Sequence, residues 1–235
     1  DRMEKIAVIG GGAAGMMAAI SAAETSHEVH LFEKNEKLGK KIFITGKGRC
    51  NLTNASDMDE IRRNIVTNSK FMYSALYTLS NDDVIQMFQD VGVETKVERG
   101  NRVFPVSDKS SDIIWGLTKM LKKQQVSIHL NTGVRDILWE EGLEKKPVIK
   151  GIVTEDGEKL FFSKVIIATG GYSYQSTGST GDGYRFAKET GHRVTDILPA
   201  LVPLVVKEEC VKEMQGLSLK NIRADFYVEG KKVYS

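Results

Sequence analysis

A glycine-rich segment near the N-terminus limits the fold of this chain more than any other feature. Residues 10 to 15 read GGGAAG and match the pattern GxGxxG. They follow an apolar run, Lys5 to Ile9, and lead into a stretch rich in Ala and Met, Ala13 to Glu24, with the next apolar run at Glu28 to Glu33. A strand, a tight turn, a helix and a second strand in this order predict a βαβ unit with a parallel sheet and a right-handed crossover.

The spacing of the glycines is typical of a turn that binds the pyrophosphate of a dinucleotide. Gly10 permits the tight turn, Gly12 lets the phosphates approach the backbone, and Gly15 allows close packing of the helix on the strand. The helix N-terminus adds free N–H groups and a partial positive charge. Glu33 ends the second strand at the ~20-residue spacing of a carboxylate that accepts from ribose hydroxyls and disfavours a 2′-phosphate. We expect dinucleotide binding in a Rossmann-like α/β fold; the alternative is an ordinary βα turn without a ligand.

Composition and charge exclude several other classes of protein. The 33 Lys and Arg residues against 31 Asp and Glu residues leave a net charge of +2, too little to favour nucleic acid or an anionic membrane as a partner. Cys50 and Cys210 are far apart and lie in no CxxC motif or histidine cluster, which argues against a disulfide framework and a metal site. No apolar run approaches membrane-spanning length. We expect a soluble, cytoplasmic protein with no metal.

Periodicity predicts further elements in the middle of the chain. Helical spacing runs through residues 57–92 with a start at Ser80 or Asn81, and a second amphipathic helix is expected over 110–125, capped by Ser107 or Asp108. A hairpin is expected over 93–106 around Gly100-Asn101, and a strand over 126–130. Alternating stretches at 134–139, 148–154 and 159–162 predict a small antiparallel meander with a turn at Asp156-Gly157.

The last third of the chain predicts a return to the parallel sheet and then a change of pattern. VIIATGG at 165–171 reads as a buried strand that ends in glycines, and 180–192 as a loop that enters a helix. After Pro199 the pattern becomes β-like, with VPLVV and a hairpin signal at Glu229-Gly230. We expect a dinucleotide-binding domain over 1–195 and the start of an incomplete, β-rich substrate domain over 196–235.

A long Gly- and Lys-rich loop favours FAD over NAD. Where an NAD-binding fold has a second short crossover, this chain has GKKIFITGKGRCNLTN at 39–54, then a helical insertion and the meander. The cations of this loop suit two phosphate charges, and its glycines leave backbone N–H groups free. Its neutral donors, Asn51, Thr53 and Asn54, suit the ribityl chain or the rim of a flavin. Single lysines in such a loop can also be merely solvated.

The chain resembles a family of bacterial FAD-dependent flavoproteins known as NAD(FAD)-utilising dehydrogenases, which includes aminoacetone oxidase and a bile-acid dehydro-intermediate reductase. The resemblance runs through IAVIGGGAAGMMAA, LGKKIFITGKGRCNLTN, VIIATGGYSYQSTGSTGDGYRFAKETGH and LPALVPL. It implies a noncovalent FAD, with Val134 beside the adenine through its backbone. The family's C-terminal segment, which closes over the flavin, has no counterpart here, so we expect a truncated chain. The expected cofactor-binding residues are Gly10, Gly12, Ala13, Ala14, Gly15, Glu33, Lys34, Lys41, Gly48, Arg49, Cys50, Asn51, Thr53, Val134, Ala168, Thr169, Gly170, Gly171, Gly181 and Asp182.

These features predict an FAD-dependent oxidoreductase that transfers two electrons between a small organic substrate and NAD(P)H or dioxygen. NAD(P)H would visit the flavin transiently, because a second GxGxxG motif for it is not evident. Two alternatives stay open: a tRNA-modifying flavoprotein, which the charge balance disfavours, and a flavin-binding module without turnover. Cys50 as a reactive thiol and His192 as an acid–base group are weaker hypotheses than structural roles for both. No catalytic residue and no oligomeric state is assigned.

Overall fold

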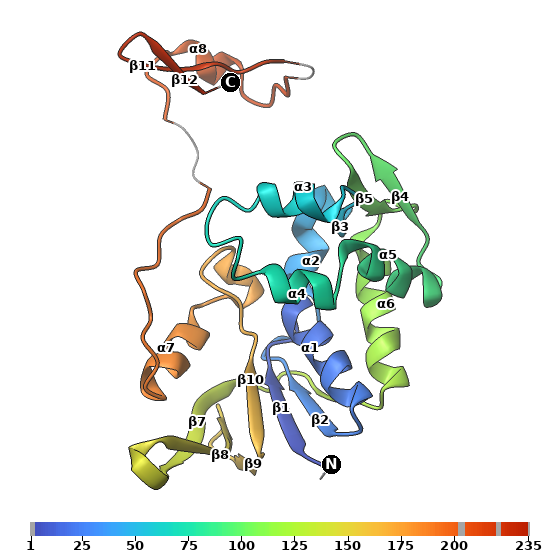
Figure 1. Cartoon of the computed structure of the whole chain (residues 1–235), viewed down its shortest axis with the longest axis vertical. Coiled ribbons are helices and arrows are strands. Elements are labelled where there is room, and N and C mark those ends of the chain that lie inside the picture. Colours follow the sequence, from blue (N-terminus) through green and yellow to red (C-terminus); the bar gives the residue numbers. More distant parts are fainter. Residues whose placement is uncertain (1–2, 202–204, 220–221, 235) are drawn as a thin grey trace. The chain divides into compact units, whose positions relative to one another are not determined.

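A parallel four-stranded sheet forms the centre of the larger part of the chain (Figure 1). Its order is β10 (Lys164–Ile167), β1 (Lys5–Ile9), β2 (Glu28–Phe32) and β6 (Ser127–His129). The computed structural model describes residues 3–201, 205–219 and 222–234. The chain divides into two compact units, Asp1–Val194 and Thr195–Ser235. The α/β fold with a parallel sheet, predicted from the glycine motif, is confirmed.

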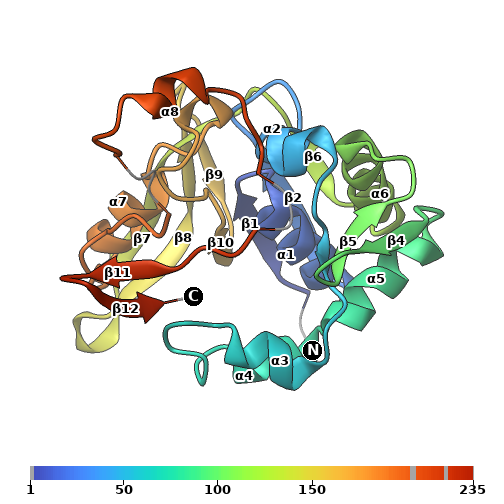
Figure 2. The same ribbon diagram turned by 90° about the horizontal axis from the view of Figure 1, so that it is seen from above.

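Strand β1 separates two hydrophobic cores because its side chains alternate between the faces of the sheet. Ile6 and Val8 join a core with α1 (Ala13–Glu24), α5 (Asn81–Asp90) and α6 (Ser110–Lys123). Ala7 and Ile9 face the other core, which contains side chains of the meander and α7 (Asp182–Glu189). Figure 2 shows the sheet between these two layers. Successive side chains of a strand point to opposite faces of the sheet, and both faces of β1 are covered, so all four apolar side chains are buried.

The meander consists of β7 (Val134–Glu141), β8 (Pro147–Thr154) and β9 (Lys159–Phe161), all antiparallel, as predicted. A short 3-10 turn, η2 (Leu143–Lys145), joins its first two strands. Gly157 has φ +93°, which fits the expected tight turn between the last two. The meander shares a hydrophobic core with the sheet, and this core contains both Val134, the first residue of the meander, and Phe32, the last residue of β2.

The insertion between β2 and β6 contains short helices and a second small sheet. Its elements are α2 (Lys40–Ile44), η1 (Thr45–Gly48), β3 (Thr53–Asn54), α3 (Met58–Arg63), α4 (Tyr73–Thr78), α5, β4 (Thr95–Glu98), β5 (Arg102–Pro105) and α6. Ser80 is the N-cap of α5 and forms a capping box with Asp83, as one of the two predicted starts requires. The predicted hairpin is β4–β5, with Gly100 and Asn101 both at positive φ.

Two expectations for this unit are wrong. Helix α6 begins after Lys109, and neither Ser107 nor Asp108 caps it. The Asp108 carboxylate is instead bound by Lys96 and Arg49, so it is not available to the helix. The strand expected over 165–171 ends at Ile167, and it is only partly buried because it forms an edge of the sheet: Ile167 is 39% exposed.

The smaller unit contains a short helix, α8 (Cys210–Glu213), and a hairpin of β11 (Phe226–Val228) and β12 (Lys231–Tyr234). Glu229 and Gly230 both have positive φ at the turn, as the predicted hairpin requires. Residues 202–204 of the VPLVV stretch lie outside the described residues. The second unit is thus partly β, with a helical turn that the sequence pattern did not predict.

Candidate functional site: a dinucleotide cavity

A cavity of about 750 Å³ opens at the carboxyl ends of the central strands. Gly10 follows β1, Glu33 follows β2 and Ala168 follows β10, and all three line the cavity. Ligands of open α/β sheets bind at this edge of the sheet, and the volume lies in the usual range for small-molecule sites. The topology therefore brings three separate sequence motifs to one site.

The glycine turn has the conformation that its spacing predicts. Gly10 has φ +107°, a backbone conformation that L side chains rarely adopt. A Cβ on Gly15 would lie 1.7 Å from the carbonyl oxygen of Gly10, so helix α1 can pack on the turn only with glycine there. A Cβ on Gly12 would meet no atom within 4 Å. Gly12 lines the cavity, so its missing side chain leaves space for a ligand rather than for the protein.

The N-terminus of α1 is open toward the cavity. Gly12 is the N-cap and supplies no side-chain hydrogen bond, and the first turn carries no acidic residue. Ala13 and Ala14 line the cavity and are exposed. The free N–H groups of this first turn and the helix dipole make this end of α1 suited to an anion such as a diphosphate.

Glu33 is buried at the side of the cavity and is held by backbone groups. Its carboxylate accepts hydrogen bonds from the N–H of Gly11 at 2.7 Å and from the N–H and side-chain amide of Asn35 at 2.8 and 2.7 Å. A carboxylate offers about four lone-pair sites, and these three hydrogen bonds leave one free, on the oxygen that accepts from Gly11. Glu33 is therefore fixed in place and can still accept from a ribose hydroxyl.

Three lysines line the cavity and differ in their partners. Lys34 pairs with Asp182 at 2.9 Å, and Lys40 pairs with Glu36 at 2.9 Å. Lys41 donates to the hydroxyls of Ser179 at 2.6 Å and Ser173 at 3.3 Å and is in no ion pair with the described residues. Lys41 is thus the cavity lysine whose charge is not already balanced, and we expect it to face the diphosphate.

The far wall of the cavity carries an unpaired polar atom. The hydroxyl oxygen of Thr169 is buried and has no hydrogen-bond partner among the described residues. Thr169 lines the cavity next to Gly170, whose φ is +75°. A buried hydroxyl without a partner is unfavourable unless a ligand or water satisfies it. Together with the space at Gly12 and the free helix end, this donor set fits a dinucleotide such as FAD.

The structure brings together twelve of the twenty residues predicted for the cofactor. Those that line the cavity are Gly10, Gly12, Ala13, Ala14, Glu33, Lys34, Lys41, Val134, Ala168, Thr169, Gly170 and Asp182. The other eight lie off the cavity lining: Gly15, Gly48, Arg49, Cys50, Asn51, Thr53, Gly171 and Gly181. Gly15 packs below the turn, and Gly181, with φ +84°, is the N-cap of α7.

Arg49 belongs to a charge cluster outside the cavity. Its guanidinium pairs with Glu98 and with Asp108, the latter at 2.7 Å, and stacks over Phe104 at 4.1 Å from the ring centroid. Hydrogen bonds from Arg49 lower the pKa of Glu98, and a hydrogen bond from Lys96, followed by one from Arg49, lowers the pKa of Asp108. Arg49 therefore ties the Lys-rich loop to the β4–β5 hairpin.

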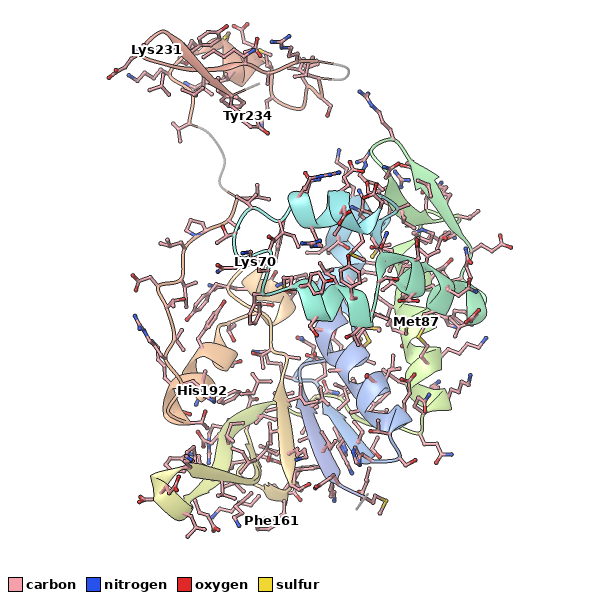
Figure 3. All side chains as sticks on the ribbon, viewed as in Figure 1. Lys70, Met87, Phe161, His192, Lys231 and Tyr234 are labelled. Atoms are coloured by element: carbon pink, nitrogen blue, oxygen red, sulfur yellow. The ribbon has the colours of Figure 1, made fainter. Side chains whose placement is uncertain are left out.

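Two residues weighed for chemistry are placed differently by the structure. Cys50 is buried, and burial raises the pKa of its thiol, which disfavours a reactive thiolate. His192 follows α7 (Figure 3) and lines the cavity, and its backbone N–H donates to the carbonyl oxygen of Ala187 at 2.8 Å. His192 thus lies at the cavity, whereas Cys50 belongs to the hydrophobic core.

Several cavity residues were not among the predicted site residues. Asn35 follows Glu33 at the end of β2, and its position at a strand's carboxyl end is the signal that would have identified it. Ser179 is buried and contacts Lys41 across 138 residues of sequence, so no local pattern announces it. Other lining residues of this kind include Thr45, Thr132, Gly133, Ile167, Thr177, Gly178 and Tyr184. Thr177 ends the 3-10 turn η3 (Gln175–Thr177), and Tyr184 lies in α7.

Other kinds of site find little support in the described part of the chain. The described residues contain no cluster of three or more His, Cys, Asp or Glu side chains that could hold a metal ion. Within the same residues, helices of the length and hydropathy needed to cross a bilayer are absent.

The fold and the cavity define a dinucleotide-binding protein of the Rossmann class. Within that class the chain belongs to the family described as HI0933-like protein Rossmann domain, whose model matches residues 4–233. This is a family of FAD-dependent oxidoreductases, and the resemblance inferred from the motifs is confirmed.

Two relatives are similar in sequence to this chain over most of its length. A 3-dehydro-bile acid delta(4,6)-reductase of Clostridium scindens is 37% identical over 218 residues, which is 92% of this chain and 51% of that protein. A ribosomal RNA dihydrouridine synthase of Escherichia coli is 28% identical over 219 residues, 93% of this chain and 52% of that protein. The chain spans about half the length of these relatives.

A solved structure shows the same fold at low sequence identity. The 3-ketosteroid delta1-dehydrogenase of Sterolibacterium denitrificans superposes with a TM-score of 0.62 at 15% identity, over 82% of this chain and 56% of that one. At this identity the similarity concerns the fold alone.

Proposed function

We propose that this chain forms the FAD-binding part of an oxidoreductase that transfers two electrons between a small organic substrate and NAD(P)H or dioxygen. The observation that carries the proposal is the cavity in which the open N-terminus of α1, the buried carboxylate of Glu33 and the unpaired cation of Lys41 meet. These three groups match the charges and hydroxyls of a dinucleotide. Family membership supports FAD as that dinucleotide.

Each part of the cavity has a role in this proposal. Glu33 accepts from the ribose of the ADP half, and the backbone of Val134 lies beside the adenine. The first turn of α1 and Lys41 hold the diphosphate, while Thr169 and Gly170 approach the flavin half. When bound, the flavin supplies the hydride chemistry, and the chain supplies orientation and electrostatic stabilisation.

The names of the two relatives favour one substrate chemistry. A delta(4,6)-reductase and a dihydrouridine synthase both saturate a carbon–carbon double bond. We therefore propose that the substrate contains a carbon–carbon double bond, which gains one hydride and one proton while NAD(P)H is oxidised to NAD(P)⁺. The small-molecule substrate is preferred because the more similar relative acts on a bile acid derivative.

The first test of this proposal is the visible spectrum of the purified protein, with the released compound identified by chromatography. We expect a flavin spectrum and released FAD. Anaerobic mixing with NADH or NADPH should then bleach the flavin, and an unsaturated 3-oxo steroid acid, but not its saturated counterpart, should restore the oxidised spectrum. Failure of the protein to take up added FAD would contradict the proposal that FAD is its cofactor. Bound flavin that neither pyridine nucleotide reduces would leave dioxygen-coupled oxidation of a substrate as the test of the reaction.

A second candidate function is modification of RNA, which the 28% identical ribosomal RNA dihydrouridine synthase favours. In this case the substrate double bond lies in a uridine of RNA. Filter binding of ribosomal RNA distinguishes the two candidates. Salt-sensitive retention that persists at saturating FAD would favour the RNA function, since phosphate contacts outside the cavity would remain available. Retention lost on addition of FAD would favour competition for the phosphate site and hence the small-molecule function.

A further inference from the structure

A second cavity lies on the other side of α2 from the dinucleotide site. It has a volume of about 550 Å³ and is formed by the segment before α2, by Phe43 of α2, by α6 and by residues of and after β6. Its apolar lining consists of Leu38, Phe43, Ile114, Ile128 and Leu130. Phe43 is 51% exposed and Leu130 is 38% exposed, so a large part of this lining faces solvent. Covering such a surface with an apolar ligand is favourable because it removes apolar area from water.

The charges at this cavity have one sign. Lys37 and Lys122 line it, and it has no acidic lining residue. Lys37 lies over the ring of Phe43, with its Nζ 5.4 Å from the ring centroid, and neither lysine is in an ion pair with the described residues. Glu36, which precedes Lys37 in the sequence, is ion-paired with Lys40 at 2.9 Å and interacts with Lys37 only as a nearby charge. An apolar surface bordered by two unpaired cations is complementary to an amphipathic anion.

The cavity is separate from the dinucleotide site although the two share a wall. Lys40 and Lys41 of α2 line the first cavity, and Phe43 lines the second. The hydroxyl of Ser110 donates to the carbonyl oxygen of Phe43 at 2.8 Å, which fixes this end of α2 against α6. A ligand in the second cavity therefore need not displace a dinucleotide.

We propose that this second cavity binds a small amphipathic carboxylate, with its hydrocarbon part against Phe43, Ile114 and Leu130 and its carboxylate at one of the two lysines that border the cavity, Lys37 or Lys122. The proposal does not depend on the reaction assigned to the first cavity. It predicts a ligand with an anionic end, and it predicts that a ligand of the same length with a neutral or cationic end binds more weakly.

The experiment is a calorimetric titration of the protein with dodecanoate, below its micellar concentration, in the presence and absence of saturating FAD. We expect saturable binding at one site in both conditions. The Lys37→Gln/Lys122→Gln variant should bind dodecanoate at least tenfold more weakly. Dodecanol and dodecyltrimethylammonium should also bind the unchanged protein at least tenfold more weakly than dodecanoate.

The matched control is Lys70→Gln/Lys123→Gln, which removes the same charge from two exposed lysines that do not line the cavity. It should bind dodecanoate as the unchanged protein does. Thr118→Phe, which fills the cavity from α6, should abolish binding while the circular dichroism spectrum is retained. The proposal is overturned by an absence of saturable binding, by equal affinity in the Lys37/Lys122 variant, or by competition between dodecanoate and FAD.

Discussion

The carboxylate of Glu33 accepts a hydrogen bond from the backbone N–H of Gly11 at 2.7 Å, and this contact links the end of β2 to the glycine turn after β1. The bond is buried and joins residues 22 positions apart. It places the carboxylate that we propose as acceptor for the ribose beside the backbone that we propose approaches the diphosphate. Removal of either partner therefore affects both parts of the cavity.

Glu33→Gln should weaken FAD binding and also lower the stability of the fold. One carboxylate oxygen accepts from the N–H of Gly11 and the other from two N–H groups of Asn35, so the NH2 group of Gln would face a donor in either orientation. The amide also loses a charged acceptor, and hydrogen bonds to charged groups contribute about 1.5–3 kcal/mol. We expect the Kd for FAD to rise at least tenfold in a titration followed by flavin fluorescence. Glu94→Gln, at an exposed carboxylate that does not line the cavity, is the control and should leave the Kd within about twofold of the unchanged value.

Gly12→Ala should change mainly the affinity for FAD, whereas Gly15→Ala should change mainly the stability of the fold. A Cβ at Gly12 meets open space at the cavity, so this variant should fold normally and lose affinity for FAD. A Cβ at Gly15 meets the carbonyl of Gly10 at 1.7 Å, so this variant should lose stability by about 2 kcal/mol or more. Thermal unfolding and FAD titration of both variants measure the contrast. Equal losses of Tm in the two would contradict the assignment of the cavity.

Lys41→Gln should reduce FAD affinity in a salt-dependent way. Lys41 has hydroxyl partners only, so its charge is available to a diphosphate, whereas the charge of Lys40 is paired with Glu36. We expect a loss of about tenfold at low ionic strength, which shrinks as salt screens the interaction. The same titrations on Lys40→Gln serve as the comparison. An equal loss of FAD affinity in Lys40→Gln and Lys41→Gln would mean that the two lysines contribute only through the overall positive charge near the cavity, and not through a specific contact of Lys41.

His129 should make stability depend on pH below neutrality. Its ring contacts His30 at 2.9 Å, and burial, followed by the proximity of His30, lowers the pKa of His129. Between the lower pKa of the folded chain and the His pKa of about 6.5 in the unfolded chain, the imidazole is protonated in the unfolded chain but neutral in the folded chain. The stabilisation is complete above pH ~6.5 and is lost as the pH falls through the lower folded pKa.

His129→Gln should therefore flatten this dependence. Urea unfolding at several pH values between 7.5 and 5 measures it, and the unchanged protein should lose more stability over this interval than the variant. His192→Gln removes a histidine outside the pair and is the control. Identical slopes for the unchanged protein and for His129→Gln would show that another group accounts for the dependence.

The glycine turn and its flanking elements were predictable because their signals are local. Gly10, Gly12 and Gly15 have separate roles that follow from backbone conformation and from the absence of a Cβ, and the neighbouring residues determine both. The same holds for Ser80, whose capping box with Asp83 spans one helical turn. The apolar run Lys5 to Ile9 likewise predicted the strand β1.

The partners of charged and polar side chains were not predictable in the same way. Arg49 was expected near the cofactor, and the structure pairs it with Glu98 and Asp108, which come from the β4–β5 hairpin and the segment after it. Asp108, expected as a helix cap, is bound in that same cluster. Both outcomes depend on which segments the fold places side by side, a matter of long-range packing.

The sequence by itself determined the parallel βαβ unit, the glycine turn and the carboxylate at the end of β2, because each depends on residues close together along the chain. Only the tertiary structure decided the composition of the cavity. Lys41 meets Ser179 from 138 residues away, and the Thr169 hydroxyl is buried without a partner. These relationships arise when β10 takes its place beside β1, since that pairing brings the end of a late strand against the first turn of the chain.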